Sequence, residues 1–162
     1  MKTNKVLFMT RAAMIAAIYV VLCVVFQPIS YGAIQTRIAE ALTILPFFTP
    51  AAIPGLFIGC LIANLLGGGI LVDVICGSAA TLIGAVGTYM LRNKSRYLAP
   101  LPPIAANVLI VPWVLRYGYG EPFSIPFLMG TVGLGELLTC GIMGMILVTV
   151  LDRYRSVTFK AA

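Results

Sequence analysis

The sequence predicts an all-α membrane protein with six transmembrane helices. Of its 162 residues, 60% are hydrophobic and only 10% are charged, and the mean hydropathy is +1.04. A soluble domain is about a quarter charged, so these proportions indicate a chain built for a hydrocarbon environment. About six spans of roughly 20 residues fill this length and leave room only for short loops. We therefore expect one integral-membrane domain over residues 1–162.

Apolar runs between turn signals define the six helices in order. The first is expected over residues 11–27, and it should be retained because no small-residue cleavage site follows it. The other five are expected over residues 37–47, 51–66, 72–92, 101–117 and 124–152. Proline and glycine residues close the second and third segments, which are short enough to form one broken hairpin.

Three clusters of basic residues test this helix count. They are Lys2, Lys5 and Arg11; Arg92, Lys94 and Arg96; and Arg153, Arg155 and Lys160. Cytoplasmic loops are enriched in Lys and Arg, and an even number of expected helices separates every pair of clusters. Both termini are therefore expected in the cytoplasm. The same clustering accounts for the net charge of +6 without nucleic-acid binding.

Ionisable and amide side chains interrupt the apolar segments at a few positions. They are Arg37, Glu40, Asn64, Asp73, Asn107 and Glu136. Charge at membrane depth is costly, so such residues usually face a bundle interior or a watery cavity and mark a ligand site. At about 1.5 Å of rise per residue, the first four lie near the outer surface, and Asn107 and Glu136 lie near the middle. This distribution predicts a cleft that opens to the outside and ends near the midplane.

The charged residues each have a structural alternative to ligand binding. Arg37 and Glu40 are three positions apart on a helix and can form an ion pair. Asp73 opens a helix, where a carboxylate caps free N–H groups and meets the positive end of the helix dipole. Glu136 has no cap position and no basic neighbour on its own helix. Its alternatives are a protonated structural acid or a pair with Arg37.

Amide and aromatic side chains could hold a flat heterocycle through hydrogen bonds and stacking. Asn64 and Asn107 are candidates, although amides also join helices in lipid. Trp113 lies near the outer end of the fifth helix, where both stacking on a ligand and interfacial anchoring are open to it. Tyr31 and Gln35 lie in the first outer loop and could close over a ligand.

Small residues on the first helix form two overlapping A-x-x-x-A pairs. They are Ala12, Ala13, Ala16 and Ala17. Such spacing supports close approach of another helix. The partner is either a helix of the same bundle or a separate membrane protein.

The sequence lacks the residues that several kinds of site require. The four cysteines show no C-x-x-C spacing, and the chain has no histidine. We therefore expect small packing cysteines, with no metal site and no disulfides. The sequence also lacks a phosphate-binding loop and a nucleophile elbow. It predicts neither an enzyme nor a cofactor, and no residue could couple ATP to transport.

Two adjoining stretches carry a family resemblance. The segment RIAEALTILPFFTPAAIPGLFIGCLIAN, followed by GGGILVDVICGSAATLIGA, resembles the QueT family of queuosine-precursor transporters. These are substrate-binding S components of energy-coupling-factor transporters, and the resemblance covers nearly the whole chain. It implies a six-helix S-component fold in a bacterial cell membrane and capture of a 7-deazaguanine outside the cell. It also implies partnership with a transmembrane coupling protein, which would dock on the alanine-rich first helix, and with two cytosolic ATPases.

The chemistry of a 7-deazaguanine suits the polar residues of this chain. Its N–H donors suit a carboxylate and its carbonyl oxygen suits an amide, types that are supplied by Glu136, Asn107 and Asn64. An aminomethyl substituent adds a cation, for which Asp73 or Glu40 is available. The alternatives are an S component for another vitamin, and a small structural membrane protein whose polar residues only join helices.

Overall fold

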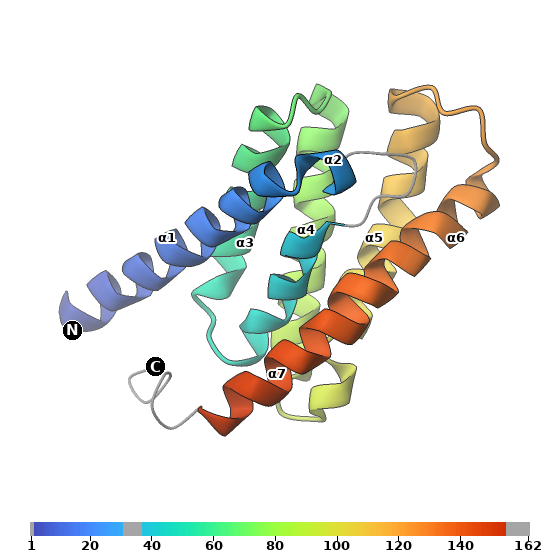
Figure 1. Cartoon of the computed structure of the whole chain (residues 1–162). Helices are drawn as coiled ribbons and strands as arrows, with labels where there is room; N and C mark the ends of the chain where they lie inside the picture. Colours follow the sequence, from blue (N-terminus) through green and yellow to red (C-terminus); the bar gives the residue numbers. More distant parts are fainter. Residues whose placement is uncertain (1, 31–36, 155–162) are drawn as a thin grey trace.

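The computed structural model shows a bundle of helices in which the start of α1 and the end of α7 lie toward the same end (Figure 1). It describes residues 2–30 and 37–154, and these ranges contain no strand. The helical elements are α1 (Lys2–Val25), α2 (Gln27–Ser30), η1 (Ile38–Phe47), α3 (Ala52–Leu66), α4 (Leu71–Leu91), η2 (Arg96–Leu98), α5 (Leu101–Trp113), η3 (Val114–Gly118), α6 (Ile125–Glu136), η4 (Leu137–Met143) and α7 (Gly144–Arg153).

The expected all-α membrane architecture with six helical passes is confirmed in the described part of the chain. The stretches long and apolar enough to cross a bilayer are Lys5–Val25, Leu71–Leu91, Arg96–Gly118 and Ile125–Arg153. The helices η1 and α3 are shorter and also apolar. At about 1.5 Å per residue, α3 falls short of a hydrocarbon core of about 30 Å. η1 and α3 are the short second and third helices that the sequence predicts.

Two helices differ from the sequence prediction. α1 begins at Lys2 rather than at residue 11, because no glycine or proline interrupts the residues between them. η1 is a 3-10 helix of 10 residues, longer than the run of about three or four that is usual for this form. Arg37, directly before η1, has an extended backbone with φ −82° and ψ 101°. Its side chain therefore leaves the backbone in a different direction from those of η1.

Small residues bring α1 and α3 into close contact. A Cβ atom added at Gly55 would lie 2.6 Å from the carbonyl oxygen of Ala12, and one added at Gly59 would lie 3.1 Å from the Cα atom of Ala16. Only glycine allows this approach without a shift of the backbone. Ala12 and Ala16 therefore pack within the bundle, which is one of the two outcomes that their spacing allowed.

The cysteines behave largely as the small packing residues that the sequence predicts. All four are free, and Cys23, Cys60 and Cys140 are buried. Cys23 and Cys60 belong to the apolar cluster between α1 and α3, which also contains Tyr19 and Leu56.

The last two long helices each contain a wider, π-helical stretch. η3 continues α5, and η4 joins α6 to α7. Wide turns of this kind inside α-helices are frequent at functional sites. η4 begins at the residue directly after Glu136, so the backbone departs from regular α-helix geometry beside the deepest expected acid.

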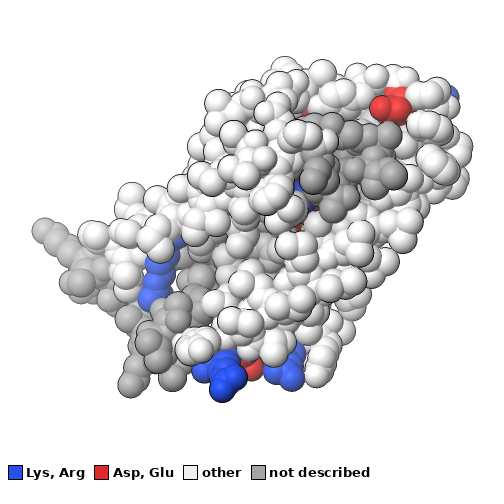
Figure 2. All heavy atoms as spheres, in the orientation of Figure 1, with Lys and Arg blue, Asp and Glu red and all other residues white. Residues whose placement is uncertain are grey.

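Charged side chains are scarce on the middle of the surface. Figure 2 shows basic atoms gathered toward the end of the bundle where α1 starts and α7 ends, with a largely uncharged band above them. At that end Arg96 and Asp152 lie 3.6 Å apart and link η2 to α7. This distribution agrees with basic clusters on one side of a membrane.

Candidate functional site

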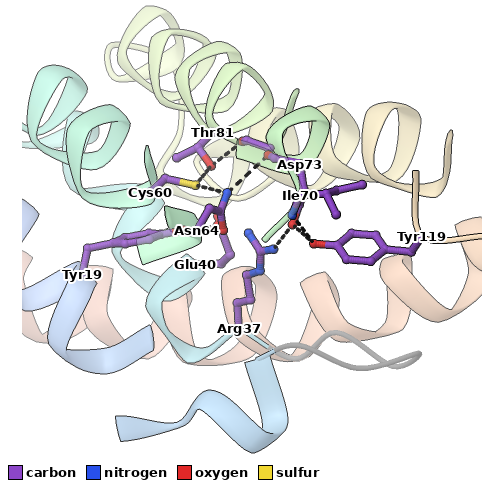
Figure 3. A network of polar contacts seen from close by, with 10 residues as sticks. Tyr19, Arg37, Glu40, Cys60, Asn64, Ile70, Asp73, Thr81 and Tyr119 are labelled. Atoms are coloured by element: carbon purple, nitrogen blue, oxygen red, sulfur yellow. Dashed lines mark hydrogen bonds and ion pairs between the residues drawn. The ribbon is translucent and has the colours of Figure 1, made fainter. Parts of the chain in front are cut away.

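Arg37 and Asp73 form a buried ion pair between the start of η1 and the first turn of α4. Their Nη2 and Oδ2 atoms lie 3.4 Å apart, and their side chains are 8% and 2% exposed. The Tyr119 hydroxyl donates to the same oxygen at 2.9 Å, from the other side of the carboxylate (Figure 3). Burial raises the pKa of Tyr119, and the negative charge of Asp73 raises it further. We call these three residues, together with Asn64, the ion-pair cluster.

Asn64 ties α3 to this cluster. Its Nδ2 atom donates to the backbone oxygen of Asp73 at 3.4 Å and lies 3.7 Å from the sulfur of Cys60. The residue is 1% exposed. These contacts favour helix joining, which was the structural alternative for this amide.

The ion pair differs from the one that the sequence spacing suggests. Arg37 and Glu40 are three positions apart, but Arg37 forms an ion pair with Asp73, because Arg37 precedes η1 in an extended conformation. Asp73 also differs from a simple cap. The backbone N–H of Ile70 donates to the Tyr119 hydroxyl at 3.4 Å, and the Asp73 carboxylate is bound by side chains. Its place in the first turn of α4 remains favourable for a negative charge.

Glu40 of η1 and Glu136 at the end of α6 form a second group, which we call the carboxylate pair. They are 1% and 7% exposed. The Tyr19 hydroxyl of α1 donates to Oε1 of Glu40 at 2.5 Å, and Nδ2 of Asn107 in α5 donates to Oε1 of Glu136 at 2.8 Å. The Cys140 thiol donates to Oε2 of Glu136 at 3.2 Å. Oε2 of Glu40 is buried and has no hydrogen-bond partner among the described residues.

A small cavity lies against the carboxylate pair. It has a volume of about 10 Å³ and is lined by Arg37, Glu40, Asn107, Val111, Val132 and Glu136. That is room for about one water molecule. A flat heterocycle that reached this cavity would therefore extend beyond it. The cavity also connects the two groups, because Arg37 of the ion-pair cluster forms part of its wall.

The carboxylate pair could attract a small cation. The ligand atoms of Glu40, Glu136 and Cys140 lie within 4.8 Å of one another, and carboxylates and thiolates are both metal ligands. The Cys140 sulfur, however, lies 3.1 Å from the backbone oxygen of Glu40 and 3.2 Å from Oε2 of Glu136, and its one proton can be donated to either acceptor. The thiol is thus placed as a hydrogen-bond donor, whereas metal binding requires the thiolate.

Trp113, one of the expected site residues, does not join these groups. Trp113 is 51% exposed and stacks on Tyr117, with ring centroids 6.0 Å apart. It lines a groove between α4 and α5 rather than the cavity at the carboxylate pair. This exposed position favours interfacial anchoring over ligand contact. Tyr31 and Gln35 lie outside the described residues.

Sequence reasoning assigned no site role to three residues that complete the polar network, namely Tyr19, Tyr119 and Cys140. Cys140 lies four positions after Glu136, and this spacing on one helix face could have indicated their contact. Tyr19 carries no comparable signal, because an aromatic residue in an apolar helix normally packs in the core. Its partner Glu40 is 21 positions away in the sequence.

Comparison with known proteins identifies the family of this polar membrane bundle. The family model of the QueT transporter matches residues 9–153. The chain belongs to the QueT transporter family. It is 40% identical over 85 residues to the queuosine precursor transporter QueT of Lactococcus lactis subsp. cremoris (strain MG1363). No solved structure matches the chain.

The alignment with this relative is partial. It covers 51% of this chain and 50% of the relative, so the chain spans about half the length of the curated relative that it matches. Membership of the QueT transporter family confirms the resemblance seen in the sequence. The chain is therefore a member of a transporter family, with helices long and apolar enough to cross a membrane.

Proposed function

We propose that this QueT family member is the substrate-capture component of an energy-coupling-factor importer. Its substrate is a queuosine precursor, 7-aminomethyl-7-deazaguanine or a related deazaguanine. It is not an enzyme, and it acts with a transmembrane coupling protein and two cytosolic ATPases. It lies in a bacterial cell membrane with both termini in the cytoplasm. The observation that carries the proposal is a buried carboxylate pair beside an amide-lined cavity, in a chain of a transporter family.

The residues at the cavity suit a nitrogen heterocycle. Glu136 offers carboxylate oxygens to N–H donors of the substrate, and Asn107, 2.8 Å from it, offers an amide to a carbonyl oxygen. Pockets for such ligands combine apolar walls with a few directed polar groups. We propose Glu136, Asn107, Glu40 and Arg37 as the main contacts. Asp73 supports them by holding the guanidinium of Arg37 in place.

Binding in the absence of ATP is the direct test of this function. Titration calorimetry of the purified protein with 7-aminomethyl-7-deazaguanine should give saturable heat, with far tighter binding than for guanine. A lack of saturable heat with every deazaguanine tried would contradict the proposal. In vesicles that contain this chain alone, the protein should bind the ligand without concentrating it. Accumulation by the lone chain would show that no partner is needed.

The outer face of α1 offers a surface for the coupling protein. Ala13 and Ala17 are exposed, and they border a groove of about 690 Å³ between α1 and α3. The groove is apolar, with walls that include Phe8, Met9 and Ile58. Small residues beside apolar ones allow close packing of a membrane helix. We propose that a helix of the coupling protein occupies this groove.

Two tryptophan substitutions separate docking from internal packing. Ala17→Trp places a bulky ring on the exposed face, so it should prevent co-purification with the coupling protein and leave ligand binding nearly unchanged. Ala16→Trp should instead destabilise the chain itself, because Ala16 is 8% exposed and faces Gly59 of α3. Normal assembly of the Ala17→Trp variant would contradict docking at this face.

A structural membrane protein without a ligand is the alternative from a different class. The ion-pair cluster fits that alternative, because the Asp73 carboxylate is bound by Arg37 and Tyr119 of neighbouring elements. The carboxylate pair does not, since helix-joining polar groups are normally satisfied and Oε2 of Glu40 has no partner among the described residues. An S component for another vitamin is the nearer alternative. Competition between deazaguanines and other vitamins in the binding assay distinguishes it.

A further inference from the structure

Acidic groups outnumber basic groups in the buried polar core. Arg37, Glu40, Asp73 and Glu136 are each at most 8% exposed, and they comprise one base and three acids. Arg37 lies 3.4 Å from Asp73. One base cannot neutralise three acids, so negative charge is left over at the carboxylate pair. Buried charge without compensation is costly, which favours either a proton or a positively charged ligand at this point.

The hydrogen bonds of the carboxylate pair show which of its oxygens lacks a partner. Both oxygens of Glu136 accept hydrogen bonds, from Asn107 and Cys140, and Oε1 of Glu40 accepts one from Tyr19. Oε2 of Glu40 is buried and makes no hydrogen bond to the described residues. A proton on this oxygen would itself need an acceptor. A hydrogen-bond donor inside the cavity that Glu40 lines would supply what this carboxylate lacks.

The size of the cavity limits what that donor can be. A volume of about 10 Å³ holds about one water molecule and is far too small for a bicyclic ring. A primary ammonium group is similar in size to water and carries three N–H donors. Such a group can enter at the end of a short substituent, while the ring to which it is attached stays outside the cavity.

We propose that Glu40 and Glu136 together bind a primary ammonium group of the substrate, with the nitrogen in this cavity. The inference rests on the proposed function and deepens it, because it selects the cationic members of the substrate class. The sequence left Asp73 and Glu40 open as partners of such a cation. Asp73 is already bound by Arg37 and Tyr119, whereas Glu40 has an oxygen to offer. The ammonium group thus orients the substrate with its substituent inward.

A pair of deazaguanines that differ only in charge tests the proposal. The 7-aminomethyl compound carries the ammonium group, and the 7-hydroxymethyl compound is a neutral analogue of nearly the same size. Hydrogen bonds to charged groups are the stronger ones, so the wild-type protein should prefer the aminomethyl compound by at least about tenfold. Glu40→Gln should reduce this preference to about threefold or less, because the aminomethyl compound loses more affinity than the hydroxymethyl compound. Thermal unfolding of the variant in detergent checks separately that it is folded.

A matched control removes a carboxylate elsewhere. Asp152→Asn, at the partly exposed contact between α7 and η2, should keep the wild-type preference. Equal affinity of the wild-type protein for both compounds would overturn the inference and leave the proposed function standing. A lack of binding of any deazaguanine would instead remove the proposed function. Loss of the preference on addition of EDTA would show that a metal ion occupies the pair, and would also overturn the inference.

Discussion

The ion-pair cluster and the carboxylate pair are both buried in an apolar bundle, and they differ in how their charges are met. In the ion-pair cluster, Asp73 lies 3.4 Å from Arg37 and accepts a hydrogen bond from Tyr119 at 2.9 Å. In the carboxylate pair, Glu40 and Glu136 share a cavity with an amide, and one buried oxygen of Glu40 has no partner among the described residues. Charge balance thus separates polar residues that hold helices together from those suited to receive a ligand.

The largest expected effect is on the stability of the ion-pair cluster. Asp73→Asn removes the negative partner of a buried guanidinium, and breaking a buried pair from one side costs about 3 kcal/mol or more. The free energy of unfolding should fall alike with and without ligand, as measured by thermal unfolding in detergent. Asp152→Asn is the control, because its pair with Arg96 is largely open to solvent and contributes little to stability. If Asp73→Asn kept its full stability, Asp73 would belong with the ligand-binding residues instead.

The carboxylate pair should show the opposite pattern. Glu136→Gln replaces one acceptor by a donor, and a hydrogen bond to a charged group is worth roughly 1.5–3 kcal/mol. Affinity for the deazaguanine should therefore fall by about tenfold to a hundredfold. Stability without ligand should be unchanged or improved, because a buried charge is removed. Unchanged affinity together with a large loss of stability would reverse the contrast between the two groups.

Tyr119 permits a smaller test of the ion-pair cluster through its hydroxyl. Tyr119→Phe removes one hydrogen bond to Asp73, which is worth about 1 kcal/mol. The pKa of Tyr119 is raised in the folded protein, so the hydroxyl's contribution is full below the ordinary tyrosine pKa of about 10. It is lost as the pH rises through the folded value. Thermal unfolding of both proteins across this alkaline range should converge at the upper end. A difference in stability between the two proteins that stays constant across this range would show that the Tyr119 hydroxyl does not titrate there.

The smallest effect is expected at Trp113. Its ring is half exposed and stacks on Tyr117 outside the cavity, so Trp113→Leu should change the affinity for the deazaguanine by less than about twofold, within the scatter of exposed substitutions. Its contribution should appear in insertion or stability within the membrane, as expected of an interfacial anchor. A tenfold loss of affinity would extend the binding site to the outer end of α5.

The sequence predicts the helices well because turn residues mark most of their ends. Pro50 and the glycines at 67–69 bracket α3, and the unusual acids and amides in apolar runs mark the polar core. Glu40, Asn107 and Glu136 could be expected near a common site on this basis. The structure brings them to one cavity.

Partner choice within the polar core could not be predicted from spacing. Arg37 and Glu40 suggest a local pair, but the extended backbone at Arg37 directs its side chain to Asp73, 36 positions away. The A-x-x-x-A pattern was similarly ambiguous. Only the position of Gly55 and Gly59 on the neighbouring helix shows that Ala12 and Ala16 pack inward. Both choices depend on how the helices face one another, and a single sequence does not contain that information directly.

Tyr19 of α1 links Glu40, a proposed ligand-binding residue, to the helix that carries the proposed docking surface. Its hydroxyl donates to Glu40, and its Cβ atom lies against Gly59 beside Ala16. A ligand that draws Glu40 toward the cavity acts on α1 through this phenol. Thermodynamic linkage then requires that any change in partner affinity on substrate loading be matched by an equal change in substrate affinity on docking. One side chain would thus allow the coupling protein to distinguish a loaded protein from an empty one.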